Sequence, residues 1–328
     1  MDIKISSVLS RLSGLLVLLV GVTFLSFSLM YLAPGDPAEA LLRAGGSMPS
    51  REAVESKREE MGLNRPFLVQ YGSWLSDCAK GDLGKSMIDG KDVTRQLLAA
   101  LKSSMALSVL SLVCGVAVAL PVGVYASVRK NSMFDRIACF IIFFRMSMPA
   151  FMVGLGFLYL FAYRMRLVPI SSSMAGAAGI ILPVMTLATG ICAKMIRQVR
   201  SIISDELNAF YVDGLRSRGI KEERILFAHV LKNAMLPIIT LVALSFGELL
   251  GGTAITETIF SFPGIGKLVM EAIHLRDYTI VQGFVVVVAV IFFLVYGFTE
   301  LSYGLFDPRV RAGKTGGKLR GHMKGRAG

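Results

Sequence analysis

The sequence contains few charged residues and few residues of the kinds that build metal, disulfide or nucleotide sites. Only 18% of its 328 residues are charged, against about 25% in an average soluble protein. Its four cysteines show no pairing pattern, and we expect them to be small buried side chains. The one Gly-Lys-Thr, at residues 313–315, has Pro308 where a phosphate-binding loop needs its first glycine. We therefore predict no catalytic residue, no metal site and no cofactor bound by this chain.

Hydrophobic residues, in contrast, make up 54% of the chain and gather in long runs. A helix needs about 20 apolar residues to cross a hydrocarbon core of about 30 Å. Six runs reach that length: Leu12–Leu32, Met105–Val128, Ile137–Tyr163, Gly176–Ile196, Leu236–Ile255 and Val281–Phe306. The first could be a signal peptide, but it is longer than the usual apolar core of about 7–15 residues. We predict an all-α integral membrane protein with six transmembrane helices, the first one uncleaved.

The distribution of positive charge predicts the orientation of these spans. With a cytoplasmic N-terminus, 20 of the 35 Lys and Arg residues fall on the inner side, in the N-terminus, 129–136, 194–232 and the tail from Arg309. Positive residues near span ends face the cytoplasm, so we expect both termini inside. The tail 309–328 is basic and poor in apolar residues. We expect it to be disordered and to touch anionic lipid rather than nucleic acid.

The topology suggests a domain organisation with a small outer domain. Residues 1–33 form the N-terminus and first span, 34–102 an extracytoplasmic cap, and 103–308 the remaining five spans. The cap has ten basic and ten acidic residues. Within it we predict a helix from Ser50, as N-cap, to about Met61, and an amphipathic stretch from Phe67 to Leu75.

The inner loop between the fourth and fifth spans, residues 198–234, is unusually long and amphipathic throughout. Gly219 allows a reversal between two short helices. The apolar face of such a hairpin either packs on its own spans or docks into a groove of another protein. The residues alone leave both possibilities open.

At this loop the sequence resembles the permease subunit of an ABC importer. The resemblance is carried by Tyr211-Val212, Leu215-Arg216, Gly219, His229, Leu231, Asn233-Ala234 and Leu236-Pro237. Motifs in matching order between residues 10 and 311 resemble the dipeptide, oligopeptide and nickel branch: Gly35-Asp36-Pro37, Gly62-Leu63-Asn64-Arg65-Pro66, Ser147-Met148-Pro149, Glu257-Thr258-Ile259-Phe260, Pro263-Gly264-Ile265-Gly266 and Asp307-Pro308-Arg309. The sequence departs from the family pattern at three places, one of which is Ser261-Phe262 where Ser-Trp is more usual. Asp213-Gly214-Leu215 replaces Glu-Ala-Ala, and Arg145 stands where a small residue is expected.

The resemblance implies a transport subunit of the cell inner membrane, not an enzyme. Its implied partners are a second homologous permease subunit, two ATP-binding subunits that hydrolyse ATP, an extracytoplasmic substrate-binding protein and the lipid bilayer. The residues implied in ATPase coupling are Tyr211, Asp213, Gly214, Leu215, Arg216, Gly219 and His229. The forms of 215–216 and 247–252 favour nickel, carried as a small chelate, with dipeptides or oligopeptides as the alternative cargo. A secondary transporter would usually show internal repeats, which are not evident, while a structural membrane subunit without ATPase coupling remains possible on the residues alone.

Among the charged residues inside the predicted spans, three stand out: Arg145, Glu248 and Glu300. A charge at the centre of a span costs about 2.5–3.5 kcal/mol on insertion scales, so each is a candidate for function. The similar depth of Arg145 and Glu300 predicts a buried ion pair. Glu248 remains a candidate for lining a pathway, where it would suit a cationic cargo, or for bonding to the helix of a neighbouring subunit.

Overall fold

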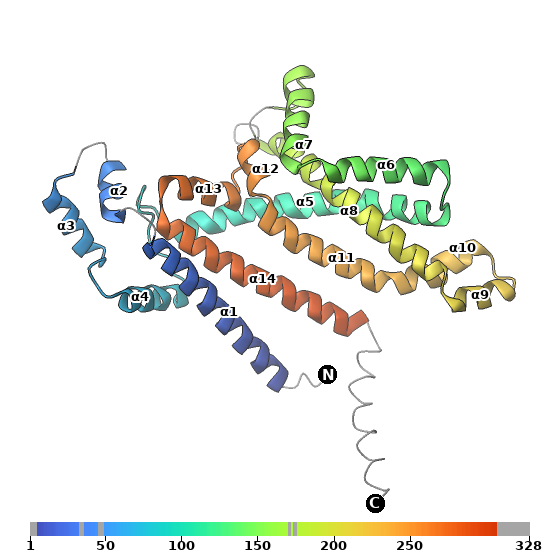
Figure 1. Ribbon diagram of the computed structural model, residues 1–328, viewed down its shortest axis with the longest axis horizontal. Coiled ribbons are helices and arrows are strands. Elements are labelled where there is room, and N and C mark those ends of the chain that lie inside the picture. The colour runs from blue at the N-terminus through green and yellow to red at the C-terminus, as the bar shows by residue number, and fades with distance from the viewer. Residues whose placement is uncertain (1–4, 33–35, 45–48, 170–171, 173–175, 307–328) are drawn as a thin grey trace, which may run out of the picture. The chain divides into compact units, whose positions relative to one another are not determined.

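The computed structural model describes residues 5–32, 36–44, 49–169, 172 and 176–306. Nearly all of them are helical (Figure 1): α1 (Ile5–Leu32), α2 (Pro37–Ala44), α3 (Arg51–Glu60), α4 (Phe67–Ala79), α5 (Val93–Val128), α6 (Met133–Ser147), α7 (Ala150–Phe157), the π-helix η1 (Leu158–Arg164), the 3₁₀-helix η3 (Gly176–Ile180), α8 (Ile181–Leu207), α9 (Phe210–Ser217), α10 (Glu222–Ile225), the π-helix η4 (Leu226–Val230), α11 (Leu231–Gly252), α12 (Ala254–Ile259), α13 (Ile265–Leu275) and α14 (Tyr278–Phe306). The predicted all-α fold is confirmed. The tail from Asp307 lies outside the described residues.

The chain divides into two compact units. Unit 1 comprises Met1–Ala106, Ser171–Gly176 and Gly251–Phe293, and unit 2 comprises Leu107–Ile170, Ala177–Leu250 and Leu294–Gly328. The long helices α5 and α14 contribute to both units. The unit boundaries therefore cut across the ranges inferred from topology, which stay predictions.

Three helical stretches are long and apolar enough to cross a membrane, namely Val93–Val128, Ala178–Leu207 and Glu222–Gly252. The pair α6 and α7–η1 makes a fourth if it is counted as one span. In α1 and α14, the described side chains form the shorter apolar stretches Val17–Leu29 and Tyr278–Leu294. A multi-span helical membrane protein is thus supported, and the count of six spans stays a prediction.

The third predicted span is not a straight helix. It is broken between Ser147 and Ala150, and the two parts are bent by 100°. Met148 has extended backbone angles, φ −94° and ψ 126°, because the ring of Pro149 disfavours the helical conformation of the residue before it. The Ser147-Met148-Pro149 motif therefore coincides with a break in the helix.

In unit 2, small residues let α5 approach α8 closely. A Cβ on Gly123 would lie 2.9 Å from Cγ1 of Val199, and a Cβ on Gly115 would lie 3.2 Å from the carbonyl oxygen of Ala188. Close backbone approach at small residues is the usual way in which membrane helices pack, because lipid provides no hydrophobic drive between them.

In unit 1, the predicted elements of the cap are present and attached to α1. The Ser50 hydroxyl accepts a hydrogen bond from the backbone N–H of Ala53 at 3.2 Å and caps α3 as predicted. The amphipathic stretch forms α4, whose aromatic residues contact those of α1 edge to face, for example Tyr71 against Phe24 at 5.4 Å between ring centroids. The Tyr71 and Thr23 hydroxyls are 3.0 Å apart and hydrogen-bonded. The cap is therefore held by aromatic packing and a buried polar contact.

A buried carboxylate organises the rest of unit 1. Glu257 of α12 is fully buried, and its Oε1 accepts from the Ser104 hydroxyl at 2.6 Å while its Oε2 accepts from the Lys267 N–H at 3.0 Å. A Cβ on Gly264 would lie only 2.2 Å from the carboxyl carbon of Glu257. The Glu257 and Pro-Gly motifs thus belong to one packed turn between α12 and α13.

Candidate functional site: the α9–α10 hairpin and charged side chains of the helices

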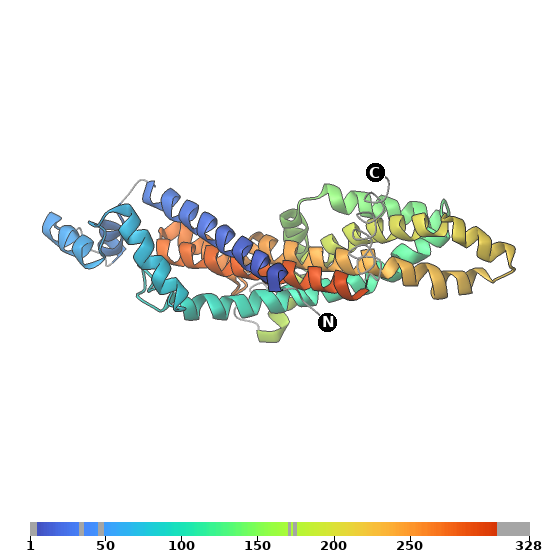
Figure 2. The same cartoon turned by 90° about the horizontal axis from the view of Figure 1, so that it is seen from below.

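The predicted loop 198–234 forms a helical hairpin in unit 2, with its first ten residues continuing α8. Here "the hairpin" means α9, α10 and η4. It lies at the end where α8 finishes and α11 begins, drawn in yellow in Figures 1 and 2. The chain reverses at Gly219, whose φ of +73° is a left-handed conformation that glycine adopts without strain. The reversal between two short helices is as the sequence predicts.

The inner face of the hairpin packs on its own helices. One cluster of buried side chains joins it to α8 and α11: Val199, Ile203, Val212, Ile225, Val230, Ala234 and Ile238. Val212, Ile225 and Val230 are fully buried, and each contributes about 1.5–3 kcal/mol to packing. Leu215 and Ile220 lie against the same cluster. The hairpin is therefore anchored to the ends of α8 and α11.

The outer face of the hairpin leaves an aromatic side chain uncovered. Phe210, the first residue of α9, is 96% exposed, and Phe227 of η4 is 69% exposed. Of the two possibilities that the sequence left open, the inner face packs on its own spans, and Phe210 stays available on the other side.

An ionic clasp closes the hairpin across its turn. Arg216 of α9 donates to Oε1 and Oε2 of Glu222 in α10 at 2.7 and 3.3 Å, and to Oδ1 of Asp213 at 3.2 Å. The Glu222 carboxylate raises the pKa of the Arg216 guanidinium, and Arg216 in turn lowers the pKa of Glu222. All three side chains are exposed, so the clasp orients α9 and α10 more than it stabilises them.

Tyr211 ties the start of the hairpin to the end of α8. Its hydroxyl donates to Oε1 of Glu206 at 2.7 Å, and the same oxygen accepts from Nδ2 of Asn233 at 2.9 Å. Burial, followed by the hydrogen bond to Glu206, raises the pKa of Tyr211 to about 12. Tyr211 therefore keeps its proton at neutral pH and acts as a hydrogen-bond donor.

The remaining residues predicted for coupling also lie in the hairpin. Gly214 is on the exposed side of α9, with nothing within 4 Å of the Cβ that it lacks. His229 is half-buried in η4. The hairpin thus brings together every residue that the resemblance implied.

Arg145 stabilises the break in the third span. Its Nε donates to the Thr189 hydroxyl at 3.1 Å, and its terminal nitrogens donate to the carbonyl oxygens of Met148 and Thr186 at 3.2 and 3.3 Å. A Cβ on Gly190 would lie 3.0 Å from its guanidinium, so glycine makes room for it. The predicted partner Glu300 is in α14, and its side chain lies outside the described residues. The Arg145–Glu300 pair stays a prediction.

Glu248 of α11 forms a salt bridge with Lys194 of α8. Lys194 falls in the predicted inner segment 194–232, at the end of the predicted fourth span, but α8 continues to Leu207, about 20 Å further along the helix axis at 1.5 Å per residue. The Glu248 side chain is 65% exposed and that of Lys194 38% exposed. The charge of Glu248 is therefore already balanced, which weakens its attraction for a cationic cargo.

A second ion pair joins α6 to α8, and sequence reasoning missed it. Oδ1 and Oδ2 of Asp135 accept from Arg200 at 2.6 and 2.8 Å, a two-pronged arrangement with little side-chain freedom. Asp135 also accepts from the N–H of Asn131 at 2.9 Å. The two residues are 65 positions apart, so only the fold could reveal the contact.

The sequence matches one protein family along nearly its whole length. Residues 119–312 match the binding-protein-dependent transport system inner membrane component, and residues 5–108 match the N-terminal part of such membrane components. The chain belongs to this family. It is a multi-pass inner-membrane permease subunit of an ABC importer and not itself an enzyme.

Individual relatives are of two kinds. The chain is 32% identical to a dipeptide transport system permease protein DppB of Alkalihalophilus pseudofirmus, with 92% of this chain and 98% of the relative aligned. It is 34% identical to a nickel import system permease protein NikB of Staphylococcus aureus, with 94% of this chain and 92% of the relative aligned. The predicted membership of the dipeptide and nickel branch is confirmed, and its members differ in cargo.

The fold also resembles a solved transporter. A chain of the MetNI methionine ABC transporter, in an inward-facing conformation, aligns with a TM-score of 0.51 and 18% identity, covering 66% of this chain and 95% of that chain. At this identity the likeness shows the fold alone.

Proposed function

We propose that this chain forms, together with a second homologous permease subunit, the translocation pathway of an ATP-driven importer. An extracytoplasmic binding protein delivers the cargo, and two ATPases dock on the inner side. The excess of basic residues in the predicted inner segments supports an orientation with both termini in the cytoplasm.

The observation that carries the proposal is the two-sided character of the hairpin. Its inner face is held by fully buried Val212, Ile225 and Val230, while Phe210 is exposed on its outer side. A large exposed aromatic side chain on an anchored element is well suited to fill a pocket of a partner, because aromatic anchors dominate interface energies. ATPases that closed on ATP would pull a joint of this kind as a unit.

Movement of the hairpin would be transmitted to the spans. The buried cluster joins the hairpin directly to the ends of α8 and α11, and packed elements of this type shift as rigid bodies between discrete states. The Arg216–Glu222 clasp keeps α9 and α10 together during that movement. Tyr211 and Glu206 keep α9 aligned with α8.

Two cargo classes remain for this machinery. The sequence favours nickel as a small chelate, and the relatives include importers of both dipeptides and nickel. Glu248 is one pathway candidate, now together with Lys194. A pair of opposite charges suits a cargo that carries both signs better than it suits a simple cation. Competition of uptake by nickel salts against dipeptides distinguishes the two classes.

The docking role is tested by removing the exposed aromatic ring. Phe210→Ala should lower the amount of ATPase that co-purifies with the tagged chain at least about tenfold, corresponding to about 1.4 kcal/mol. The matched control is Phe140→Ala, which removes another exposed ring, in α6 and outside the hairpin. Equal ATPase recovery for Phe210→Ala and wild type would contradict the docking role.

A further inference from the structure

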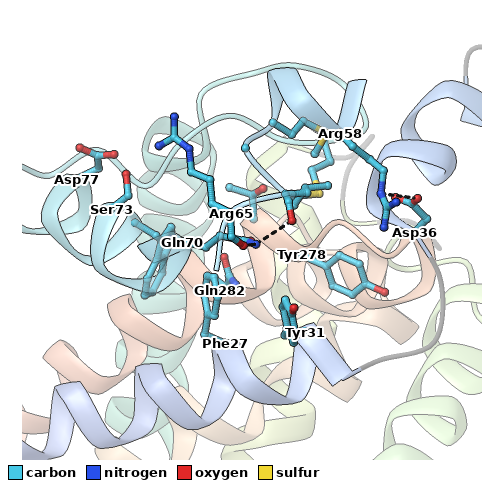
Figure 3. A pocket seen from close by; sticks show the side chains of 16 residues that line it. Phe27, Tyr31, Asp36, Arg58, Arg65, Gln70, Ser73, Asp77, Tyr278 and Gln282 are labelled. Atoms are coloured by element: carbon cyan, nitrogen blue, oxygen red, sulfur yellow. Dashed lines mark hydrogen bonds and ion pairs between the residues drawn. The ribbon is translucent and has the colours of Figure 1, made fainter. Parts of the chain in front are cut away.

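The cap contains a cavity that the proposed transport mechanism does not use. It has a volume of about 600 Å³ and lies entirely within unit 1, lined by residues of α1, α3, α4 and the start of α14 (Figure 3). Its size falls within the range of about 300–1,000 Å³ found for small-molecule sites.

Charges of both signs line this cavity in equal number. Arg58 and Arg65 are the cations, and Asp36 and Asp77 are the carboxylates. In Figure 3 the charged side chains form two groups, with Arg58 beside Asp36 on one side and Arg65 extending towards the side of Ser73 and Asp77 on the other. The cavity is therefore neutral as a whole but strongly polar at its rim.

The two groups differ in how far their charges are already satisfied. Nε of Arg58 lies 3.1 Å from Oδ2 of Asp36, a direct ion pair. Among the described residues, Asp77 forms one ion pair, with the exposed Lys80 at 3.1 Å. Arg65 forms no ion pair within the described part of the chain, and only its backbone carbonyl oxygen is engaged by the nearby Gln70, whose Nε2 donates to it at 2.8 Å. Arg65 and Asp77 are thus the charges that a ligand can engage.

The rest of the cavity wall is aromatic and amide-bearing. Phe27, Tyr31, Trp74 and Tyr278 contribute rings, and Gln282 contributes an amide. In Figure 3, Tyr31, Phe27 and Tyr278 lie on the side opposite the Arg65 guanidinium. Such rings provide large apolar contact area for the uncharged part of a ligand.

We propose that this cavity binds a zwitterionic small molecule of the short-peptide type. The ligand carboxylate is held by the Arg65 guanidinium, the ligand ammonium by Asp77, and its apolar part by the aromatic rings. Arginine suits the first role because its planar fork matches a carboxylate.

A bare divalent cation fits the cavity poorly. The charges of its two carboxylates are offset by those of its two arginines, and the described residues contain no group of three or more His, Cys, Asp or Glu side chains placed to hold a metal ion. The inference deepens the proposed importer function by naming a cargo class, and it rests on that function for the role of the cavity as a receiving site on the permease.

The chain contains its own reporter for this site. Trp74 is the only tryptophan of the sequence and lines the cavity. The full chain in lipid nanodiscs, without partners, is titrated with L-alanyl-L-alanine while tryptophan fluorescence is recorded. We expect a saturable change, and at least tenfold weaker binding of the N-acetylated, C-amidated dipeptide, which lacks both charges. This comparison needs no variant and so does not depend on how substitutions affect folding.

Variants then identify the residues responsible. Arg65→Gln and Asp77→Asn should each weaken the dipeptide at least tenfold. Arg51→Gln and Glu59→Gln are the controls, since they make the same charge changes on exposed positions of α3 outside the cavity, and they should leave affinity unchanged.

Three results would overturn the inference: no saturable change at millimolar dipeptide, equal binding of the blocked dipeptide, or saturable binding of nickel chloride in preference to the dipeptide. Because no ATPase is present in the titration, a failure here leaves the importer assignment standing. Conversely, a failure of the ATPase co-purification test would not affect the result of the dipeptide titration.

Discussion

At the scale of single residues, backbone conformation at Gly219 is the most specific requirement of the hairpin. A Cβ at this position would meet nothing within 4 Å, so space does not demand glycine. The φ of +73° does, because side-chain-bearing residues are strained there and β-branched ones most of all. Conformation and size can therefore be separated experimentally.

Gly219→Val should strain the turn by about 1–3 kcal/mol and shift α10 relative to α9. We expect the variant to reach the membrane and to hydrolyse ATP with its partners, but to lose transport. Gly219→Asn is the control, because asparagine tolerates the left-handed region, and it should keep most uptake. Coupled uptake at wild-type rate in the valine variant would argue against a role of this turn.

Tyr211 provides a prediction of pH dependence. Its pKa is raised to about 12, from about 10 in an unfolded chain. The hydrogen bond to Glu206 therefore contributes fully to stability below pH 10, and that contribution is lost as the pH rises through 12. Tyr211→Phe should lower stability by about 0.5–1.5 kcal/mol at neutral pH.

An ultraviolet absorbance titration checks this assignment. The late-titrating tyrosine should disappear in Tyr211→Phe and persist in Tyr163→Phe, which removes an exposed hydroxyl elsewhere. A late component unchanged in Tyr211→Phe would show that another tyrosine carries it.

Variants of the Lys194–Glu248 pair can distinguish a structural role of this salt bridge from a role in the translocation pathway. Glu248→Gln leaves Lys194 without its partner, and it should lower both the amount of protein in the membrane and the rate of cargo uptake. The double variant Lys194→Met/Glu248→Gln removes both charges, and replacing both members of a pair is commonly tolerated. If the pair also serves the pathway, the double variant should regain the wild-type amount of protein in the membrane without regaining cargo uptake. Recovery of both would assign the pair a purely structural role.

At the scale of elements, the break between α6 and α7 depends on two features acting together. Pro149 interrupts the helix, and Arg145 binds the carbonyl oxygen of Met148 that the interruption leaves without a helical partner. The same guanidinium reaches the Thr189 hydroxyl of α8. The bend is thereby fixed against its neighbour.

Arg145→Lys should destabilise the protein by about 1–3 kcal/mol, because an ammonium group cannot reproduce hydrogen bonds from one planar fork to three oxygens. Thermal unfolding in detergent measures the loss. Glu300→Gln is measured alongside it, because lysine at position 145 keeps the positive charge and could still form an ion pair with Glu300. A stable Arg145→Lys together with an unstable Glu300→Gln would favour that ion pair over the hydrogen-bonded role.

Elements set by local signals could be predicted from the sequence, whereas contacts between elements could not. Ser50 begins α3 and Gly219 reverses the hairpin because capping and positive φ are local properties. The partner of Glu248 escaped prediction because it depends on how α8 and α11 are aligned along their length. The length of α8 was also underestimated, since its polar last turns resemble a loop in composition while packing Val199 and Ile203 into the core.

At the scale of the whole molecule, composition predicted a membrane protein, and the resemblance of motifs in matching order along the chain predicted the family. The predicted orientation would account for the excess of 12 positive charges over negative ones, because 20 of the 35 basic residues fall in the predicted inner segments. In that predicted orientation the hairpin would be cytoplasmic and the cap extracytoplasmic.

The most direct test measures ATP hydrolysis and uptake together in proteoliposomes containing this chain, its second permease subunit, the ATPases and the binding protein. We predict that ATP drives accumulation of labelled dialanine in the wild type, and that Phe210→Ala abolishes it while the permease subunits stay assembled. Accumulation that continues without ATP, or at full rate in Phe210→Ala, would contradict the account.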